Sequence, residues 1–262
     1  MSGRWLAGAV SLIGLGAATG ANQMAPSTTR YRIDSKLEQV VDLTAVGQPS
    51  QTTVVTQVAL LTLALKDTVG GQTMHTVIDS LASDSPAVTD ALAQARGGWV
   101  HGTLDSWGRA KVTATSADSN TIIAQLKGTM IRFFPILKPG ARQGDTWMDT
   151  STTDIKTPAQ TMKSTTITTF THGGSTTHDG QPATRIDATS ETIGAGTMEN
   201  AMAGSMQVEV KTLTTSSYFV GTGGRFLGGE SKADGNSTVR TPMAPLPIPV
   251  TIKQVSTFAI VK

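Results

Sequence analysis

The segment that decides the fold is DSNTIIAQLKGTMIRFF, residues 118–134, which Pro135 follows directly. Apolar residues recur in it at the three- and four-residue spacing of a helix, and a proline cannot continue one. We therefore expect a helix that begins at Asp118 or Ser119 and ends near Phe134. Its apolar face comprises Ile122, Ile123, Leu126, Met130, Ile131, Phe133 and Phe134. A helix with so wide an apolar face has to be buried against something large.

Most of the remaining chain has the pattern of β-strands, in which apolar and polar residues alternate. In the first strand, expected over 31–41, Tyr31 and Ile33 alternate with polar residues. Glycine marks the turns between strands, as at Gly70 and Gly71. Further strands are expected over 52–66, 73–81, 99–104, 109–115, a stretch entered through 144–147, and over 167–171, 183–190, 206–215, 217–220, 225–232 and 250–261.

Two stretches leave alternatives open. Residues 58–65 are almost continuously apolar, which fits either a buried strand or a buried helix. We favour a strand, because a hairpin connection and another alternating strand follow at once. The threonine-rich stretch 150–177 could be disordered. Ile155, Ile167 and Phe170 recur there among residues of high β propensity, and they favour strands instead.

A second and shorter helix is expected between two of these strands. Ser85 is a candidate N-cap, and Pro86 follows at the first helical position. The helix runs to Arg96 and stops at Gly97. Its apolar face is narrow, which suits a short helix lying on a sheet. The chain is thus expected to form about ten strands and two helices.

The first twenty residues match a secretory signal peptide. Arg4 precedes an apolar run from Trp5 to Leu15, and small residues follow. The run is too short and too rich in glycine for a membrane span, which needs about 20 apolar residues. We expect a signal peptide over 1–20, a linker over 21–29 and a single domain over 30–262. The protein would be periplasmic or secreted, without the cysteine that a lipoprotein requires.

Two parts of the domain resemble each other weakly, residues 30–137 and residues 144–262. In the first part Gly70 precedes Ile78 by eight positions, while in the second Gly180 precedes Ile186 by six, and an aspartate follows each isoleucine. An internal duplication is one explanation. The chemistry of hairpin turns, which need glycine, is the other.

Composition limits the partners and the source of stability. The chain has 21 lysines and arginines against 19 aspartates and glutamates, so its net charge gives no steering toward nucleic acid. It has no cysteine. Disulfides are therefore excluded, and the core alone has to stabilise the fold.

The sequence contains no catalytic motif that we recognise. The Gly-x-Ser-x-Gly and Ser-x-x-Lys patterns of serine nucleophiles do not occur. His172, His178 and Asp179 could converge at a turn through residues 173–175, but a zinc site needs further ligands and a second shell. We interpret this region as a polar hairpin tip. No enzymatic activity, cofactor or metal is expected.

The passage from Ile122 to Trp147 joins an apolar helix ending in Phe-Phe-Pro (133–135) to Gly-Asp-Thr-Trp (144–147). It resembles a family of exported bacterial proteins of unknown function in which a similar passage recurs. The order of elements is also similar to the incomplete-barrel fold of periplasmic lipoprotein carriers, sensor domains and lipid-transfer lipoproteins. This resemblance implies an α+β fold with a mainly antiparallel, strongly curved sheet and two helices packed on it. It carries over no functional residue.

A wide-faced helix on the concave side of such a sheet either completes a filled core or borders a lipid-sized cavity. We expect a soluble binding protein that holds an apolar or lipid-like ligand between sheet and helix. The residues expected to line this site are Ile122, Leu126, Met130 and Phe133. No nucleic acid and no membrane span after signal removal are expected, and the protein partner is unknown.

Other functions remain open at this stage. The chain could be a structural or interaction protein of the cell envelope that has a filled core and pairs through its sheet edges. An extracellular hydrolase would need a cleft in which histidines and carboxylates converge. An outer-membrane barrel is disfavoured by the 5% aromatic content and by the two helices.

Overall fold

The computed structural model describes residues 27–261, apart from 45–46, 86–88, 118–119, 158–159, 201–203, 243 and 245. The expected signal peptide, 1–20, and residues 21–26 of the expected linker lie outside the described residues. So do three expected helix-start residues, Pro86, Asp118 and Ser119. Residues 27–29, which were expected to end the linker, instead begin the first strand.

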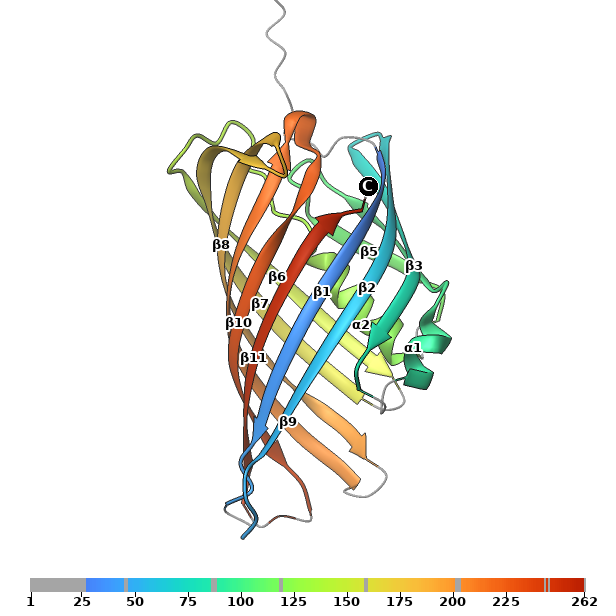
Figure 1. The fold of residues 1–262 in the computed structure, drawn as a ribbon, viewed down its shortest axis with the longest axis vertical. Coiled ribbons are helices and arrows are strands. Elements are labelled where there is room, and N and C mark those ends of the chain that lie inside the picture. Colours follow the sequence, from blue (N-terminus) through green and yellow to red (C-terminus); the bar gives the residue numbers. More distant parts are fainter. Residues whose placement is uncertain are drawn as a thin grey trace, which may run out of the picture.

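The described residues form one antiparallel sheet of eleven strands (Figure 1). The strands are β1 (Ser27–Val41), β2 (Gln51–Thr68), β3 (Gly71–Ser83), β4 (Trp99–Leu104), β5 (Ala110–Thr115), β6 (Thr146–Thr157), β7 (Gln160–His178), β8 (Gln181–Asn200), β9 (Gly204–Gly221), β10 (Phe226–Arg240) and β11 (Ile248–Ile260). The expected mainly antiparallel, curved sheet is confirmed. The description α+β holds only loosely, because strands dominate.

The sheet is a ring of strands that is interrupted at one place. Its order is β5-β4-β3-β2-β1-β11-β10-β9-β8-β7-β6, so strands that follow one another in the chain pair with each other, except β5 and β6. The first and last strands pair as well, from Tyr31 opposite Ile260 to Val41 opposite Val250. The interruption lies between β5 and β6. We call this gap the seam, and it makes the fold an incomplete barrel.

The longer of two α-helices lies at the seam. Helix α2 (Thr121–Ile131) follows β5 and precedes β6 in the chain, and it contacts both of these edge strands as well as β4. In Figure 1 it runs behind β1 and β2. The shorter helix α1 (Thr89–Ala95) contacts β3 and α2, and a 3-10 turn, η3 (Thr222–Gly224), joins β9 to β10. Helix α2 therefore takes the place of the strand that would complete the ring.

Both helices are shorter than expected. Helix α2 begins after Asn120, whose side-chain oxygen accepts hydrogen bonds from the backbone N–H groups of Ile122 (2.9 Å) and Ile123 (3.2 Å). It ends at Ile131 instead of near Phe134, because the two phenylalanines before the proline leave the helix to pack in the core. In α1, the described helical residues are Thr89–Ala95, which end one residue before the expected end at Arg96; residues 86–88, which follow the expected cap Ser85, lie outside the described residues.

Strand predictions were correct in kind, and most were too short in extent, although the expected 99–104 matches β4. Residues 58–65 lie in β2, so the helical alternative is wrong. The described residues of 150–177 lie in β6 and β7, so the alternative of disorder is wrong too. The two strands expected over 206–215 and 217–220 are a single strand, β9. Serine and threonine occupy both faces of these strands, which removes the apolar alternation that marks a strand in the sequence.

An aromatic cluster anchors the end of α2 to the middle of the sheet. The Phe133 ring lies 5.2 Å from Tyr31, 5.4 Å from Phe226 and 5.7 Å from Phe258, measured between ring centroids. The Tyr31 hydroxyl donates a hydrogen bond to the Phe226 carbonyl oxygen at 2.9 Å. Burial raises the pKa of Tyr31, so its phenol keeps this proton. These contacts tie the residues after α2 to β1, β10 and β11, opposite the seam.

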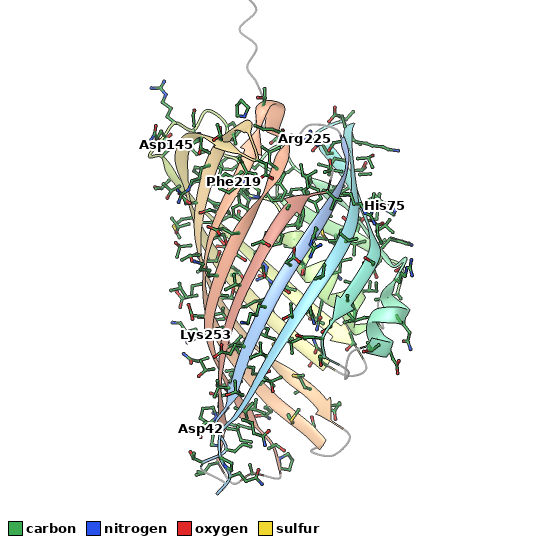
Figure 2. The ribbon with its side chains drawn as sticks, in the orientation of Figure 1. Asp42, His75, Asp145, Phe219, Arg225 and Lys253 are labelled. Atoms are coloured by element: carbon green, nitrogen blue, oxygen red, sulfur yellow. The ribbon has the colours of Figure 1, made fainter. Side chains whose placement is uncertain are left out.

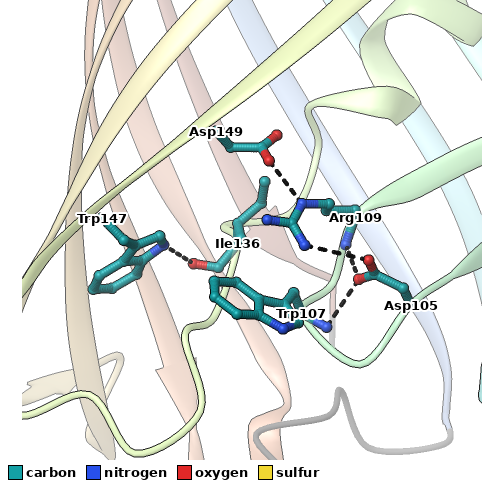
Figure 3. Close-up of polar contacts among 6 residues, drawn as sticks. All are labelled: Asp105, Trp107, Arg109, Ile136, Trp147 and Asp149. Atoms are coloured by element: carbon teal, nitrogen blue, oxygen red, sulfur yellow. Dashed lines mark hydrogen bonds and ion pairs between the residues drawn. The ribbon is translucent and has the colours of Figure 1, made fainter.

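An ion pair bridges the seam itself (Figure 3). Arg109, directly before β5, donates from Nε to Oδ1 of Asp149 on β6 at 2.7 Å. Asp105 holds the hairpin that carries this arginine, because its Oδ1 accepts from the backbone N–H groups of Trp107 (2.8 Å) and Arg109 (2.9 Å). The two edge strands are thus joined by side chains where no backbone ladder connects them.

The connection between α2 and β6 is fixed to both sides of the seam. The backbone N–H of Leu137 donates to the Trp107 carbonyl oxygen at 2.7 Å. From the other side, the Trp147 indole N–H of β6 donates to the Ile136 carbonyl oxygen at 3.1 Å (Figure 3), and its ring stacks on Phe170. This explains the Phe-Phe-Pro and Gly-Asp-Thr-Trp passage: its aromatic residues fasten the connection into the core.

The convex face of the sheet carries charged and polar side chains together with exposed apolar ones such as Ile193 and Leu213. Ion pairs on it include Arg32 with Asp34 at 2.7 Å and Lys211 with Glu191. Figure 2 shows side chains on both faces of the strands, with His75 among the exposed ones. None of the helices in the described part of the chain has the length and apolar character to cross a membrane.

We expect the Arg109–Asp149 pair to stabilise the closed seam measurably. Asp149 is 17% exposed and Arg109 38%, so the pair is screened by solvent only in part. A double-mutant cycle of Arg109→Gln and Asp149→Asn, followed by urea unfolding, should give a coupling free energy of about 1 kcal/mol. The more exposed pair Arg32 and Asp34 serves as the control and should give a clearly smaller coupling, because solvent screens it more. Equal coupling in the two cycles would contradict a stabilising role at the seam.

Candidate ligand-binding cavity

The space between α2 and the concave face of the sheet is not filled by side chains. It forms a cavity of about 560 Å³. Pockets that bury small ligands in proteins span about 300–1,000 Å³, so this volume suits a ligand. Gln57, Gln125 and Gln254 line the cavity and remain exposed, which is consistent with a hollow interior.

One side of the cavity, which we call the apolar wall, combines α2 with β1, β2, β3 and β11. Its residues include Ile33, Ala59, Leu61, Ile78, Leu81, Ile122, Leu126, Phe133 and Phe258. Because successive side chains of a strand point to opposite faces, most of these strand residues contribute at every second position, as Ala59 and Leu61 do. The apolar wall is continuous with the buried core, which contains Leu61, Ile78 and Phe133.

The other side, which we call the hydroxyl wall, comes from β6 to β9. It comprises Ser151, Thr166, Thr168, Ser190, Thr192, Thr212, Thr214 and Ser216. Hydroxyl groups pair across strands here: Thr166 with Thr192 and Thr168 with Ser190, each with an oxygen-to-oxygen distance of 2.8 Å. The cavity therefore offers apolar surface on one side and hydrogen-bonding groups on the other.

Three of the four residues expected at a ligand site line this cavity, and their role in binding a ligand stays a prediction. Ile122, Leu126 and Phe133 face the cavity from the same side of α2 and its end. Met130 does not line it; this side chain is completely buried in the hydrophobic core. A helix with apolar residues on most of its circumference has two packing faces, and the sequence does not say which one borders an empty space.

Sequence analysis missed the polar half of the site. Thr166, Thr168, Thr212 and Thr214 follow a period of two along their strands, and this was the available signal. It was masked because threonine also occupies many outward positions, such as Thr165.

Arg132 is a further cavity residue that the sequence did not reveal. It directly follows α2, lines the cavity, and donates from Nη1 to the Thr166 hydroxyl oxygen at 3.1 Å. Burial lowers the pKa of the Arg132 guanidinium, and the nearby Tyr218 phenol acts in the opposite direction on this pKa. Burial raises the pKa of the Tyr218 phenol itself. The sequence placed this arginine away from the apolar face of the helix, whereas the structure places it beside Phe133 at the cavity.

The histidines form no metal site in the part of the chain that the structure describes, where no group of three or more suitable ligands occurs. His178 stacks on Phe219 with 4.1 Å between ring centroids, and His172 Nδ1 accepts from the Gly174 N–H. The turn of this β7–β8 hairpin is at Asp179 and Gly180, so the expected turn through 173–175 is wrong. Those residues lie within β7, where the pairing shifts between His172 and Gly174.

Comparisons with known proteins add little to this geometry. No family model matches the chain, and no curated protein matches it. Two solved variants of the porin of Rhodopseudomonas blastica, each 10% identical, align with 90% of this chain and 100% of theirs at TM-scores of 0.27 and 0.25. At such scores the similarity carries no argument. The incomplete-barrel architecture is seen in the structure, while membership of the exported bacterial family stays a prediction.

If the cavity is hollow, a large side chain should be accepted there. Thr214 lines it, and its cross-strand neighbours Ala233 and Ser190 are small. We expect Thr214→Phe to change the free energy of unfolding by no more than about 0.5 kcal/mol. In the filled core, Thr76→Phe should cost about 1–3 kcal/mol, because Thr76 is completely buried. Urea unfolding of both variants tests this; similar large losses would mean that the cavity is not free space.

Proposed function

We propose that the chain is an exported, non-catalytic binding protein that holds an apolar or lipid-like ligand between the sheet and α2. The observation that carries this proposal is the cavity of about 560 Å³ beside α2, bounded by the apolar wall. When an apolar chain displaces water from a continuous apolar surface of this kind, binding is favoured by about 25 cal/mol per Å² of apolar area buried.

The two walls together favour an amphiphile over a purely apolar or purely polar ligand. Ligand pockets are typically apolar with a few placed polar groups that orient the ligand. Here Leu126 and Phe133 supply apolar surface, while Thr166 and Thr192 supply hydroxyl groups on the opposite strands. The resemblance to periplasmic lipoprotein carriers and lipid-transfer lipoproteins, and the signal-like residues 1–20, support a carrier that acts after export.

The other functions considered from the sequence receive less support. A partner that pairs with free sheet edges would have to approach β5 or β6, and α2 contacts both. For a hydrolase, the described lining includes one carboxylate, Asp149, which is bound to Arg109, and no histidine. The cavity thus favours binding over hydrolysis.

Native mass spectrometry of the purified protein, followed by organic extraction, tests the proposal. We expect bound amphiphilic species that extraction releases, and uptake of a fluorescent acyl probe by the extracted protein. A protein that is empty on purification and takes up no acyl probe would refute the proposed function.

A matched pair of variants on β9 locates the binding site. Thr214 lines the cavity, and Thr215, the next residue, is exposed on the outer face. A phenyl ring at position 214 would occupy the space of the ligand, so Thr214→Phe should abolish acyl-probe uptake. Thr215→Phe, the same change on the opposite face, should leave uptake unchanged. If both variants bind like wild type, the probe is held elsewhere.

A further inference from the structure

One cationic side chain lines the cavity without an acidic partner. Arg132 is the C-cap residue of α2, and within the described residues its guanidinium makes one hydrogen bond to protein, to the Thr166 hydroxyl. Within the described residues, no carboxylate lies at ion-pair distance from it. The other ionised group of the lining, Asp149, is already neutralised by Arg109 at 2.7 Å. The uncompensated charge of the cavity is therefore positive.

The guanidinium has capacity for a ligand. Arginine carries five N–H donors in a planar fork, and the structure supplies an acceptor for one of them at Arg132. A carboxylate or phosphate can accept two parallel hydrogen bonds from such a fork. Arg132 lines the cavity and its side chain is accessible there, so its remaining donors are available to a bound anion.

The residues near Arg132 offer hydrogen-bonding groups on one side and apolar surface on the other. Toward β7 and β8, Thr166 and Thr192 form a hydroxyl pair that continues the hydrogen bond from the arginine. Tyr218 adds a phenol, which burial keeps protonated. Along α2, Leu126 and Phe133 begin the apolar wall. An anionic headgroup at Arg132 would thus have hydrogen-bond donors on one side and a path for its chain on the other.

We propose that the ligand of the cavity is a long-chain amphiphile with a single anionic headgroup, which Arg132 binds while the chain lies against the apolar wall. The inference rests on the proposed function and names the class of its ligand. Thr166 and its partner Thr192 orient the guanidinium and complete the head site. One arginine matches one negative charge, so a monoanionic carboxylate is the simplest headgroup that fits.

Titration calorimetry with three probes separates head from tail. Hexadecanoate carries both features, hexadecanol has the chain without the charge, and acetate has the charge without the chain. We expect hexadecanoate to bind the wild-type protein about ten- to a hundredfold more tightly than hexadecanol, the range of a hydrogen-bonded charge pair. Acetate should show no measurable binding, which distinguishes an amphiphile site from a site for free anions.

Variants then assign the selectivity to one residue. Arg132→Gln should remove most of the preference for hexadecanoate while leaving hexadecanol affinity within about twofold. Arg132→Lys keeps the charge at the end of α2 and should retain part of the preference, since an ammonium binds without the bidentate geometry. Arg96→Gln removes the same charge from the exposed end of α1 and should change neither affinity. Circular dichroism melts check that the variants are folded.

The outcomes distinguish this inference from the proposed function. If hexadecanol binds as tightly as hexadecanoate, or if Arg132→Gln weakens both equally, the head site is wrong and the binding function stands. Tight binding of acetate would also overturn the inference, since the anion would then need no chain. If neither long-chain probe binds, both proposals fail together.

Discussion

The structure depends on how its ring of strands is completed at the seam. Pairing of β1 with β11 joins the two ends of the chain into the sheet, and it leaves β5 and β6 as the only edges within the described residues. Unpaired strand edges carry backbone groups that need cover, and α2 lies beside both of them. A helix carries side chains all round, so α2 covers these edges and also presents side chains to the interior. The cavity lies between this helix and the concave face of the sheet.

The contents of the interior follow from the same element. On one side of α2 the core is filled by Met130 and by the aromatic cluster around Phe133 and Phe226, which reaches across to the far strands. On its other side, strands β6 to β9 present serine and threonine side chains, which are short and form hydrogen bonds across the strands. Short side chains such as Thr166 and Thr214 leave space between their strands and α2. The cavity therefore lies where the inward residues of the sheet are small.

Sequence reasoning succeeded where local chemistry decides. The helical periodicity of the segment before Pro135 predicted α2, glycine at position 70 predicted the β2–β3 turn, and the apolar face of the helix supplied three of the residues that line the cavity. It failed where tertiary packing decides. Helix α2 ends earlier than predicted, because Phe133 and Phe134 stabilise the fold more by packing in the core than by extending the helix. Arg132 and the hydroxyl wall were missed because their common location depends on strands that are distant in the sequence.

A crystal structure of the protein with a bromine-labelled long-chain carboxylate would test the central claim most directly, since anomalous scattering locates the bromine. Our account predicts a bromine peak between α2 and the apolar wall, near Leu126, with the carboxylate of the same molecule at Arg132. A cavity occupied by repacked side chains, or a chain bound on the convex face, would contradict it.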